Sequence, residues 1–176
     1  MRGQTTLDFA TGVSLFLLAL VFVFMFVPGT LQPFTQSAQE ETVSANRVAD
    51  LLVTDLLADA DEPYLLDGPC TAKLLGSTGS PACGFDGATL QARLDLPARQ
   101  NVNVTLRGNV SGSTERLCWD AANQTVAGES TGACGDANDV LFVAGDTPPT
   151  DGGSTVTARR LVSVHGTTAS LEVRMW

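Results

Sequence analysis

The feature that most constrains this chain is an uncharged apolar run near its N-terminus, from Phe9 to Val27. A helix rises about 1.5 Å per residue, so a run of this length spans roughly the 30 Å hydrocarbon core of a bilayer. Apolar residues occur on every side of the predicted helix, unlike an amphipathic helix that lies on a membrane surface. Pro28-Gly29 is expected to break or bend it. The sequence therefore predicts one transmembrane helix.

An acidic residue, Asp8, stands at the head of this run, and Arg2-Gly3-Gln4 precedes it. A removable secretory signal explains this order poorly, because Asp8 would begin its apolar region and no A-x-A-like cleavage site follows Val27. A simple membrane anchor is a second interpretation. In that case Asp8 would lie at the water interface in the first helical turn, where the helix dipole favours an anion.

The order of basic residue, glycine, glutamine, two polar residues, apolar residue, acid and apolar run resembles the class III signal of archaeal type IV pilin-like proteins. In that family a prepilin peptidase cuts after the glycine on the cytoplasmic side, and the apolar helix is kept as the filament core. The resemblance implies cleavage between Arg2-Gly3 and Gln4, with Asp8 as the acidic residue at the fifth mature position. Gly12 departs from the leucine often found at the ninth.

A physical argument accompanies this resemblance. A lone carboxylate in hydrocarbon costs several kcal/mol and needs a partner. Cleavage after Gly3 creates an amino group on Gln4, which can meet Asp8 of a neighbouring copy in a stack of helices. An ion pair in a low dielectric contributes little net stability but can fix register. We therefore expect this pair to set the stagger between subunits.

Charge and composition bear on partners and location. The chain of 176 residues carries 19 acidic and 10 basic residues, a net charge of -9, and Lys73 is its one lysine. Such a surface repels nucleic acid, which is not an expected partner. It suits solubility in concentrated salt, where the Debye length falls to about 3 Å, although an acidic mesophilic protein can share this composition. Arg2 favours a cytoplasmic N-terminus, with everything after Pro28 outside the cell.

The predicted fold class is α+β, with a long hydrophobic helix that continues into an amphipathic helix and then a small antiparallel β-domain. The expected segments are a leader (1–3), the transmembrane or filament-core helix (4–29), a stalk helix (30–62) and an extracellular β-rich domain (63–176). The stalk has a capping-box pattern at Ser37 and Glu40, and Glu62-Pro63 is expected to end it. Its apolar stripe comprises Ala45, Val48, Ala49, Leu52, Val53, Leu56 and Leu57.

The outer domain is predicted from alternation and turn signals. Residues 67–87 are rich in Gly, Ser and Pro and are expected to form a loop. Alternating apolar residues over 90–96 and 102–106 predict strands, as does the apolar run at 139–145. Residues 155–164 and 167–175 are expected to form a hairpin that turns at His165-Gly166. We expect about five or six strands, without parallel βαβ units because no helical pattern separates them.

The four cysteines fall into two local pairs along the sequence, although three connectivities are open. Disulfides form in oxidising compartments and so agree with an extracellular domain. A zinc site is disfavoured because no C-x-x-C pair is present and the one histidine is distant, whereas reduced buried cysteines stay an alternative. The candidate disulfide residues are Cys70, Cys83, Cys118 and Cys134.

Three N-x-[ST] sequons, at Asn103, Asn109 and Asn123, lie in or near candidate loops and are candidate glycosylation sites. No G-x-S-x-G elbow, P-loop or G-x-G-x-x-G motif is present, and the acidic segments lack EF-hand spacing. We therefore predict no catalytic residues, metal ligands or cofactor.

The leading hypothesis is a type IV pilin-like subunit of an archaeal surface filament, and its large, loop-rich outer domain favours a minor subunit. Its expected partners are the prepilin peptidase, other pilin subunits, the membrane assembly platform and, before assembly, the lipid bilayer. The alternative is a membrane-anchored extracellular binding domain that does not polymerise, and an anchored enzyme is a third, weaker hypothesis. Adhesion, motility, DNA uptake and secretion are all open as roles.

Overall fold

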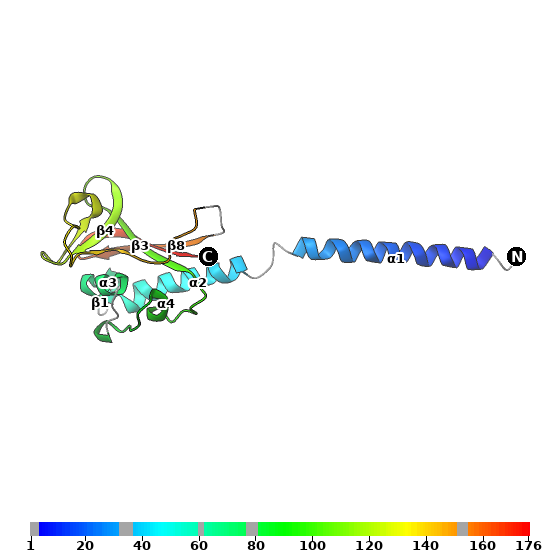
Figure 1. Ribbon diagram of the computed structural model, residues 1–176, viewed down its shortest axis with the longest axis horizontal. Coiled ribbons are helices and arrows are strands. Elements are labelled where there is room, and N and C mark those ends of the chain that lie inside the picture. Colours follow the sequence, from blue (N-terminus) through cyan, green and yellow to red (C-terminus); the bar gives the residue numbers. More distant parts are fainter. Residues whose placement is uncertain (1–3, 32–36, 60–61, 77–80, 151–154) are drawn as a thin grey trace. The chain divides into compact units, whose positions relative to one another are not determined.

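The structure is a computed structural model that describes residues 4–31, 37–59, 62–76, 81–150 and 155–176, with side chains from residues 8–26, 41–59, 62–76, 82–150 and 155–176. The chain forms two compact units, one from Met1 to Ser37 and one from Ala38 to Trp176. Each unit is described by itself below. The α+β class is confirmed, with an apolar N-terminal helix, further helices and a many-stranded sheet (Figure 1).

The first unit is built on helix α1, Gln4–Leu31. The expected break at Pro28-Gly29 is wrong, because helical backbone continues through both residues to Leu31. Proline removes only one main-chain hydrogen bond, and the remaining bonds of the last turns keep the backbone helical. Whether α1 continues into the next helix falls on residues 32–36, outside the described residues.

The second unit begins with helix α2, Ser37–Leu51, which passes into a π-helical turn, η2, Leu52–Leu56. The main-chain amide of Leu57 donates to the carbonyl of Leu52 at 3.1 Å, a five-residue step that closes this turn. The stalk helix is therefore shorter than predicted. Glu62-Pro63 does not end it but begins strand β2, Glu62–Leu66, which pairs with β1, Ala58–Asp59.

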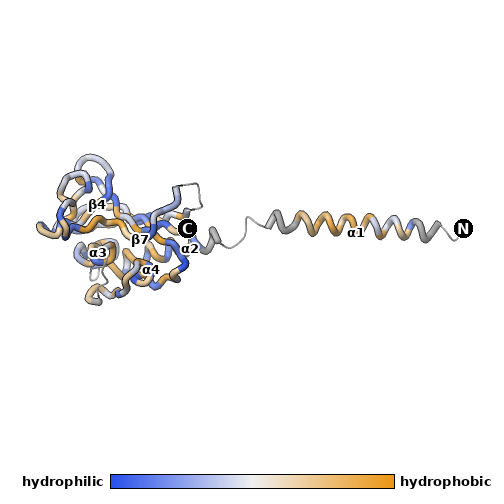
Figure 2. The backbone as a smooth tube through the Cα atoms, in the orientation of Figure 1, coloured by the Kyte–Doolittle hydropathy of each residue, from blue (hydrophilic) through white to orange (hydrophobic). Residues whose placement is uncertain are grey.

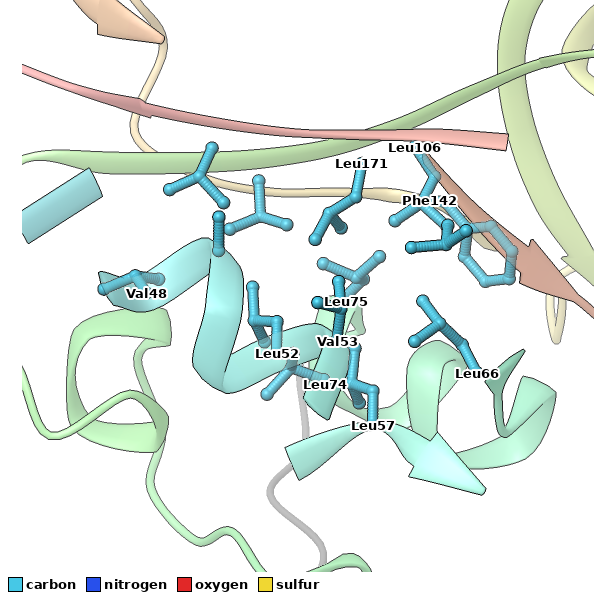
Figure 3. Close-up of a cluster of buried hydrophobic side chains, with 14 of the residues drawn as sticks. Val48, Leu52, Val53, Leu57, Leu66, Leu74, Leu75, Leu106, Phe142 and Leu171 are labelled. Carbon is cyan, nitrogen blue, oxygen red and sulfur yellow. The ribbon is translucent and has the colours of Figure 1, made fainter. Parts of the chain in front are cut away.

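The predicted stripe of α2 is confirmed as the face that enters the core. Six of its members are almost fully buried, and Leu56 is partly buried against them. Figure 3 shows Val48, Leu52 and Val53 beneath the sheet residues Leu106 and Leu171. The most deeply buried stripe residues are Ala45, Val48, Ala49, Leu52, Val53 and Leu57. This face therefore belongs to the hydrophobic core that the helices and the sheet share.

The sheet has nine strands in the order β1-β2-β8-β9-β3-β4-β5, with β6 beside β4 and β7 beside β3. This exceeds the five or six expected. The remaining strands are β3 (Val102–Asn109), β4 (Thr114–Asp120), β5 (Thr125–Gly128), β6 (Val140–Leu141), β7 (Val143–Gly145), β8 (Val156–Val164) and β9 (Thr167–Met175). Among the described strands every pairing is antiparallel except that of β2 with β8, which is parallel.

The predicted hairpin of β8 and β9 is confirmed. Its register runs from Val156 opposite Met175 to Val164 opposite Thr167. The two turn residues, His165 and Gly166, both have positive φ angles, 48° and 81°. A two-residue turn of this kind matches the right-handed twist of the strands that it joins.

Two short helices lie where the sequence predicts other structures. Residues 67–87 are not wholly a loop, since helix α3, Gly68–Leu75, buries Ala72, Leu74 and Leu75. The alternation at 90–96 is not a strand, because Leu90–Arg93 forms helix α4. The run at 139–145 is divided into β6 and β7 by the fully buried Phe142. Two 3-10 turns, η3 (Pro81–Cys83) and η4 (Glu129–Thr131), complete the helical elements described.

The domain thus has two layers, with α2, α3 and α4 on one face of the sheet (Figure 1). Successive side chains of a strand point to opposite faces. In β3 the apolar residues Val102, Val104 and Leu106 therefore face the helices, whereas Asn103 and Thr105 face the other side. The helices therefore cover the apolar face of β3, and the face of β3 that carries Asn103 and Thr105 is polar. We call this second face the polar face of the sheet.

Candidate membrane and assembly segment

Within α1, the stretch Asp8–Phe26 is long and apolar enough to cross a membrane once, and none of it is buried within the chain. Figure 2 shows its central turns in the colour of hydrophobic residues. Monomeric soluble proteins seldom expose a continuous apolar surface of this extent. The exposed large side chains are Phe9, Val13, Leu15, Phe16, Leu17, Leu18, Val21, Phe22, Val23, Phe24, Met25 and Phe26. This surface is compatible with a single-pass membrane anchor.

The polar side chains inside this stretch bond to their own helix. The Thr11 hydroxyl donates to the Asp8 carbonyl at 3.0 Å, and the Ser14 hydroxyl donates to the Ala10 carbonyl at 2.7 Å. Such local bonds let hydroxyl groups enter an apolar environment at low cost. They satisfy the hydroxyl groups of Thr11 and Ser14 within the helix.

Asp8 differs from these residues. Its side chain is exposed at the N-terminal end of the stretch and forms no ion pair or hydrogen bond with the side chains that the structure describes. A carboxylate at this position needs water, a headgroup or a cation from another molecule. Gln4 is the first residue of α1, whereas Arg2 and Gly3, the other predicted processing residues, lie outside the described residues.

In the outer domain the structure joins the cysteines as the local pairs, Cys70 to Cys83 and Cys118 to Cys134, with Cα–Cα distances of 5.6 and 6.0 Å. No cysteine is left free. Among the described residues no group of three or more His, Cys, Asp or Glu side chains is placed to hold a metal ion. The two bridges agree with an oxidising compartment outside the cytoplasm.

The structure separates the three sequons. Asn103 does not lie in a loop, as predicted, but within β3, where it is 4% exposed and donates to the Asp146 carbonyl at 3.0 Å. Asn109 is exposed at the end of β3, and its side-chain oxygen accepts from the Gly112 amide at 2.8 Å. Asn123 is exposed in the turn between β4 and β5. Two of the three sequons are therefore accessible in the folded domain.

Carboxylates fix the turns that carry these two accessible sequons. Hydrogen bonds from Ser111 and Ser130 hold the pKa of Glu115 below its usual value. The side chain of Asn123 donates to Asp120 at 2.7 Å, and this bond, with main-chain donors, lowers the pKa of Asp120. Both carboxylates, near the two ends of β4, thus act as charged acceptors for the adjacent turns.

Arg93 is a buried cation that sequence reasoning missed. It is 6% exposed and donates to the carbonyls of Leu74, Gly76 and Gly87 at 2.6, 2.5 and 3.0 Å. Desolvation lowers its pKa. Because Leu74 and Gly76 end α3, the guanidinium satisfies carbonyls at a helix C-terminus and ties α3 to α4. Its role is structural.

Sequence reasoning also missed four arginines on the polar face of the sheet: Arg107, Arg116, Arg159 and Arg174. The alternation of β3 alone predicts that Arg107 points to the face away from the buried Val104 and Leu106. The faces of the other three arginines relative to Arg107 depend on how the strands pair. Among the described residues we identify no set of catalytic side chains. The expectation that the chain is not an enzyme stays a prediction.

Comparison with known proteins gives one match. No curated protein and no solved structure matches this chain significantly. A family model described as a family of unknown function matches residues 1–176. The chain therefore belongs to the family of unknown function DUF7287.

Proposed function

We propose that this protein is a type IV pilin-like subunit of an archaeal cell-surface filament, cleaved after Gly3 and assembled through α1. Its outer domain lies outside the cell and its N-terminus begins in the cytoplasm. The acidic, lysine-poor composition supports a halophilic source, and the elaborate outer domain supports a minor subunit.

The observation that carries the proposal is the position of Asp8. It is exposed and unpaired among the described side chains, at the head of a 19-residue apolar stretch with no burial in its own chain. Both the carboxylate and the apolar surface therefore need partners from outside the chain. A stack of identical helices supplies both, with apolar side chains around α1 and a cationic N-terminus beside Asp8.

The N-terminal amine can serve as that cation only if it lies near the start of the helix. Cleavage after Gly3 makes Gln4, the first residue of α1, the new terminus. The amine and Asp8 are then four residues apart along the helix. A modest axial shift between neighbouring helices brings one subunit's amine to the level of the other's carboxylate.

The outer domain is compatible with this arrangement. Its helix α2 contributes to the hydrophobic core, and two disulfides join other segments of the domain, α3 to η3 and β4 to the loop that follows η4. A folded domain with its own core can serve display, and a helix whose apolar stretch Asp8–Phe26 is not buried can serve assembly, so the two tasks fall to the two units of the chain.

The test replaces Asp8 and follows both insertion and assembly. Asp8→Asn removes the charge, Asp8→Glu keeps it, and Asp136→Asn removes a charge from an exposed residue of the outer domain. Loss of one partner from a buried pair costs about 3–5 kcal/mol. We expect Asp8→Asn to reach the membrane at the normal level but to be nearly absent from sheared filaments, with the two other variants incorporated normally.

Normal incorporation of Asp8→Asn would contradict the role of this carboxylate in assembly. A wild-type chain that stays uncut, monomeric in detergent and retained in the membrane would instead support a membrane-anchored extracellular binding domain. The first result shows the subunit in sheared filaments, whereas in the second the wild-type subunit is absent from them.

A further inference from the structure

The polar face of the sheet concentrates positive charge in an acidic protein. Arg107 of β3, Arg116 of β4, Arg159 of β8 and Arg174 of β9 point to this face, as their register partners show. Register pairs share a face, and successive residues alternate between faces. Four of the chain's basic residues thus gather on one surface, although the whole chain has a net charge of -9.

Two carboxylates pair with three of these arginines. Glu172, 6% exposed, lies between Arg159 and Arg174, at N–O distances of 3.1 and 2.6 Å. Glu129 accepts from Arg116 Nε at 2.7 Å. Asp120, at the far end of β4 on the same face, is bonded to Asn123 and to main-chain amides of its own turn. Around Arg107, four guanidinium groups against the two paired carboxylates leave a local excess of positive charge.

Of these four arginines, Arg107 is the one whose side chain has no partner among the described residues. It stands directly opposite Arg116 in the register of β3 and β4, and like charges in such a pair repel each other. Glu129 forms an ion pair with Arg116 and so offsets its charge, but no carboxylate or carbonyl in the described part of the chain bonds to the side chain of Arg107. Its five N–H donors are therefore available to a ligand.

A hollow of about 470 Å³ lies beside these arginines. It forms where β3 changes neighbours, pairing with β4 at Arg107 and with β7 from Asn103 to Thr105. Its described lining contains no carboxylate and consists of Asn103, Thr105, Arg107, Arg116, Val143, Ala144, Gly145, Thr147, Pro148 and Arg174.

The floor of the hollow is held in place. Asn103 donates to the Asp146 carbonyl at 3.0 Å, and the Thr105 hydroxyl donates to the Asn103 side chain at 2.9 Å. Arg174 is fixed by Glu172 and Arg116 by Glu129. Among the charged side chains that line the hollow, Arg107 is therefore the one still able to bind a ligand. The surrounding side chains are already held in place and need to move little when a ligand enters.

We propose that this hollow is a carboxylate-binding site in which Arg107 is the principal ligand. The planar guanidinium fork matches a carboxylate with two parallel hydrogen bonds, and Arg116 and Arg174 add positive potential. The carboxylate comes either from a free organic acid or from an acidic side chain of a second copy, since each copy carries 19 acidic residues. This proposal does not depend on filament assembly.

The test measures citrate binding to the full chain in detergent by calorimetry, at low and constant ionic strength. The variants are Arg107→Gln, Arg107→Lys and, as a matched control, Arg99→Gln, which removes an exposed arginine outside the hollow. Loss of a charged bidentate contact raises the citrate Kd about tenfold or more. We expect this rise for Arg107→Gln, a smaller one for Arg107→Lys, and wild-type binding for Arg99→Gln.

Sedimentation of the same samples identifies the source of the carboxylate. Wild-type self-association that citrate reverses and Arg107→Gln abolishes assigns the ligand to a second copy. A monomer that binds citrate through Arg107 assigns it to a free acid. Absence of both citrate binding and Arg107-dependent association, or equal binding by Arg107→Gln and the wild type, overturns the proposal, and Arg107→Lys guards against a folding defect in the first variant.

Discussion

Asp50 of α2 accepts a hydrogen bond of 2.7 Å from Arg160 Nε of β8, across 110 residues of sequence. Arg160 also donates to Asn46 Oδ1 at 3.1 Å, one turn earlier on the same helix. This contact joins the amphipathic helix to strand β8, beside the apolar interface. It also holds the pKa of Asp50 below its usual value of 3.8.

Replacement of Asp50 should have a small and pH-dependent effect. Asp50 is 53% exposed, so Asp50→Asn should lower the free energy of unfolding by less than about 1 kcal/mol at pH 7. A carboxylate with a lowered pKa contributes stability above the unfolded value of 3.8 and loses it as the pH falls through the lowered folded value. The difference from the wild type should vanish near pH 2 in denaturant titrations, and an undiminished difference there would refute this assignment.

The buried face of α2 and η2 should dominate the stability of the outer domain. Leu52 is fully buried, whereas Val43 on the same helical segment is 68% exposed. Leu52→Ala should cost about 2–5 kcal/mol because it leaves a cavity in the core. Val43→Ala, the matched control, should change the unfolding free energy by less than about 0.5 kcal/mol. Tryptophan fluorescence during urea unfolding measures both, and similar losses would show that the stripe is not the core.

The disulfides should contribute to the stability of the same domain. Cys118 and Cys134 close a loop with a sequence separation of 16. In the chain-entropy model a loop of this length is worth about 3 kcal/mol. The double variant Cys118→Ala/Cys134→Ala should lose a comparable amount in denaturant unfolding, and a loss near zero would indicate that the bridge is absent from the native protein.

Glycosylation, if it occurs, should discriminate among the three sequons. Asn109 is exposed and its amide nitrogen makes no hydrogen bond with a described residue, whereas Asn123 uses that nitrogen to bind Asp120. Asn103 is buried in β3. Glycopeptide mass spectrometry of native protein should find the highest occupancy at Asn109, less at Asn123 and none at Asn103. Modification of Asn103 would mean that glycans are attached before the domain folds.

Local patterns were sufficient for three elements of this fold. The charge-free run gave α1, the helical spacing of Ala45 to Leu57 gave the buried face of α2, and alternation around His165-Gly166 gave the hairpin of β8 and β9. Each of these signals lies within one element. Each signal can therefore be recognised in the sequence even when the packing partner of the element is unknown.

Other elements depend on distant contacts. Helix α3 is short and contains Gly68 and Pro69, so its stability comes from burial of Leu74 and Leu75 and not from propensity. Its one local signal is Asp67, whose side chain accepts from the Cys70 amide at the helix start. A comparable signal, Thr89, precedes α4, where alternating leucines were misread as a strand.

The arginines of the polar face were hidden for a related reason. Arg107 can be placed from the alternation of β3 alone, but its position opposite Arg116 and near Arg174 depends on the pairing of β3 with β4 and β9. Register is set by the whole sheet, and a shift of one residue would move every one of these side chains to the other face. The hollow therefore could not be predicted from the sequence.

The proposal as a whole rests on a new positive terminus beside a carboxylate at the edge of the membrane. Intact-mass and N-terminal peptide analysis of protein isolated from native membranes or filaments measures this most directly. We predict a mature chain that begins at Gln4, without Met1-Arg2-Gly3. A chain that retains this tripeptide, or that is cut at another bond, would contradict the account.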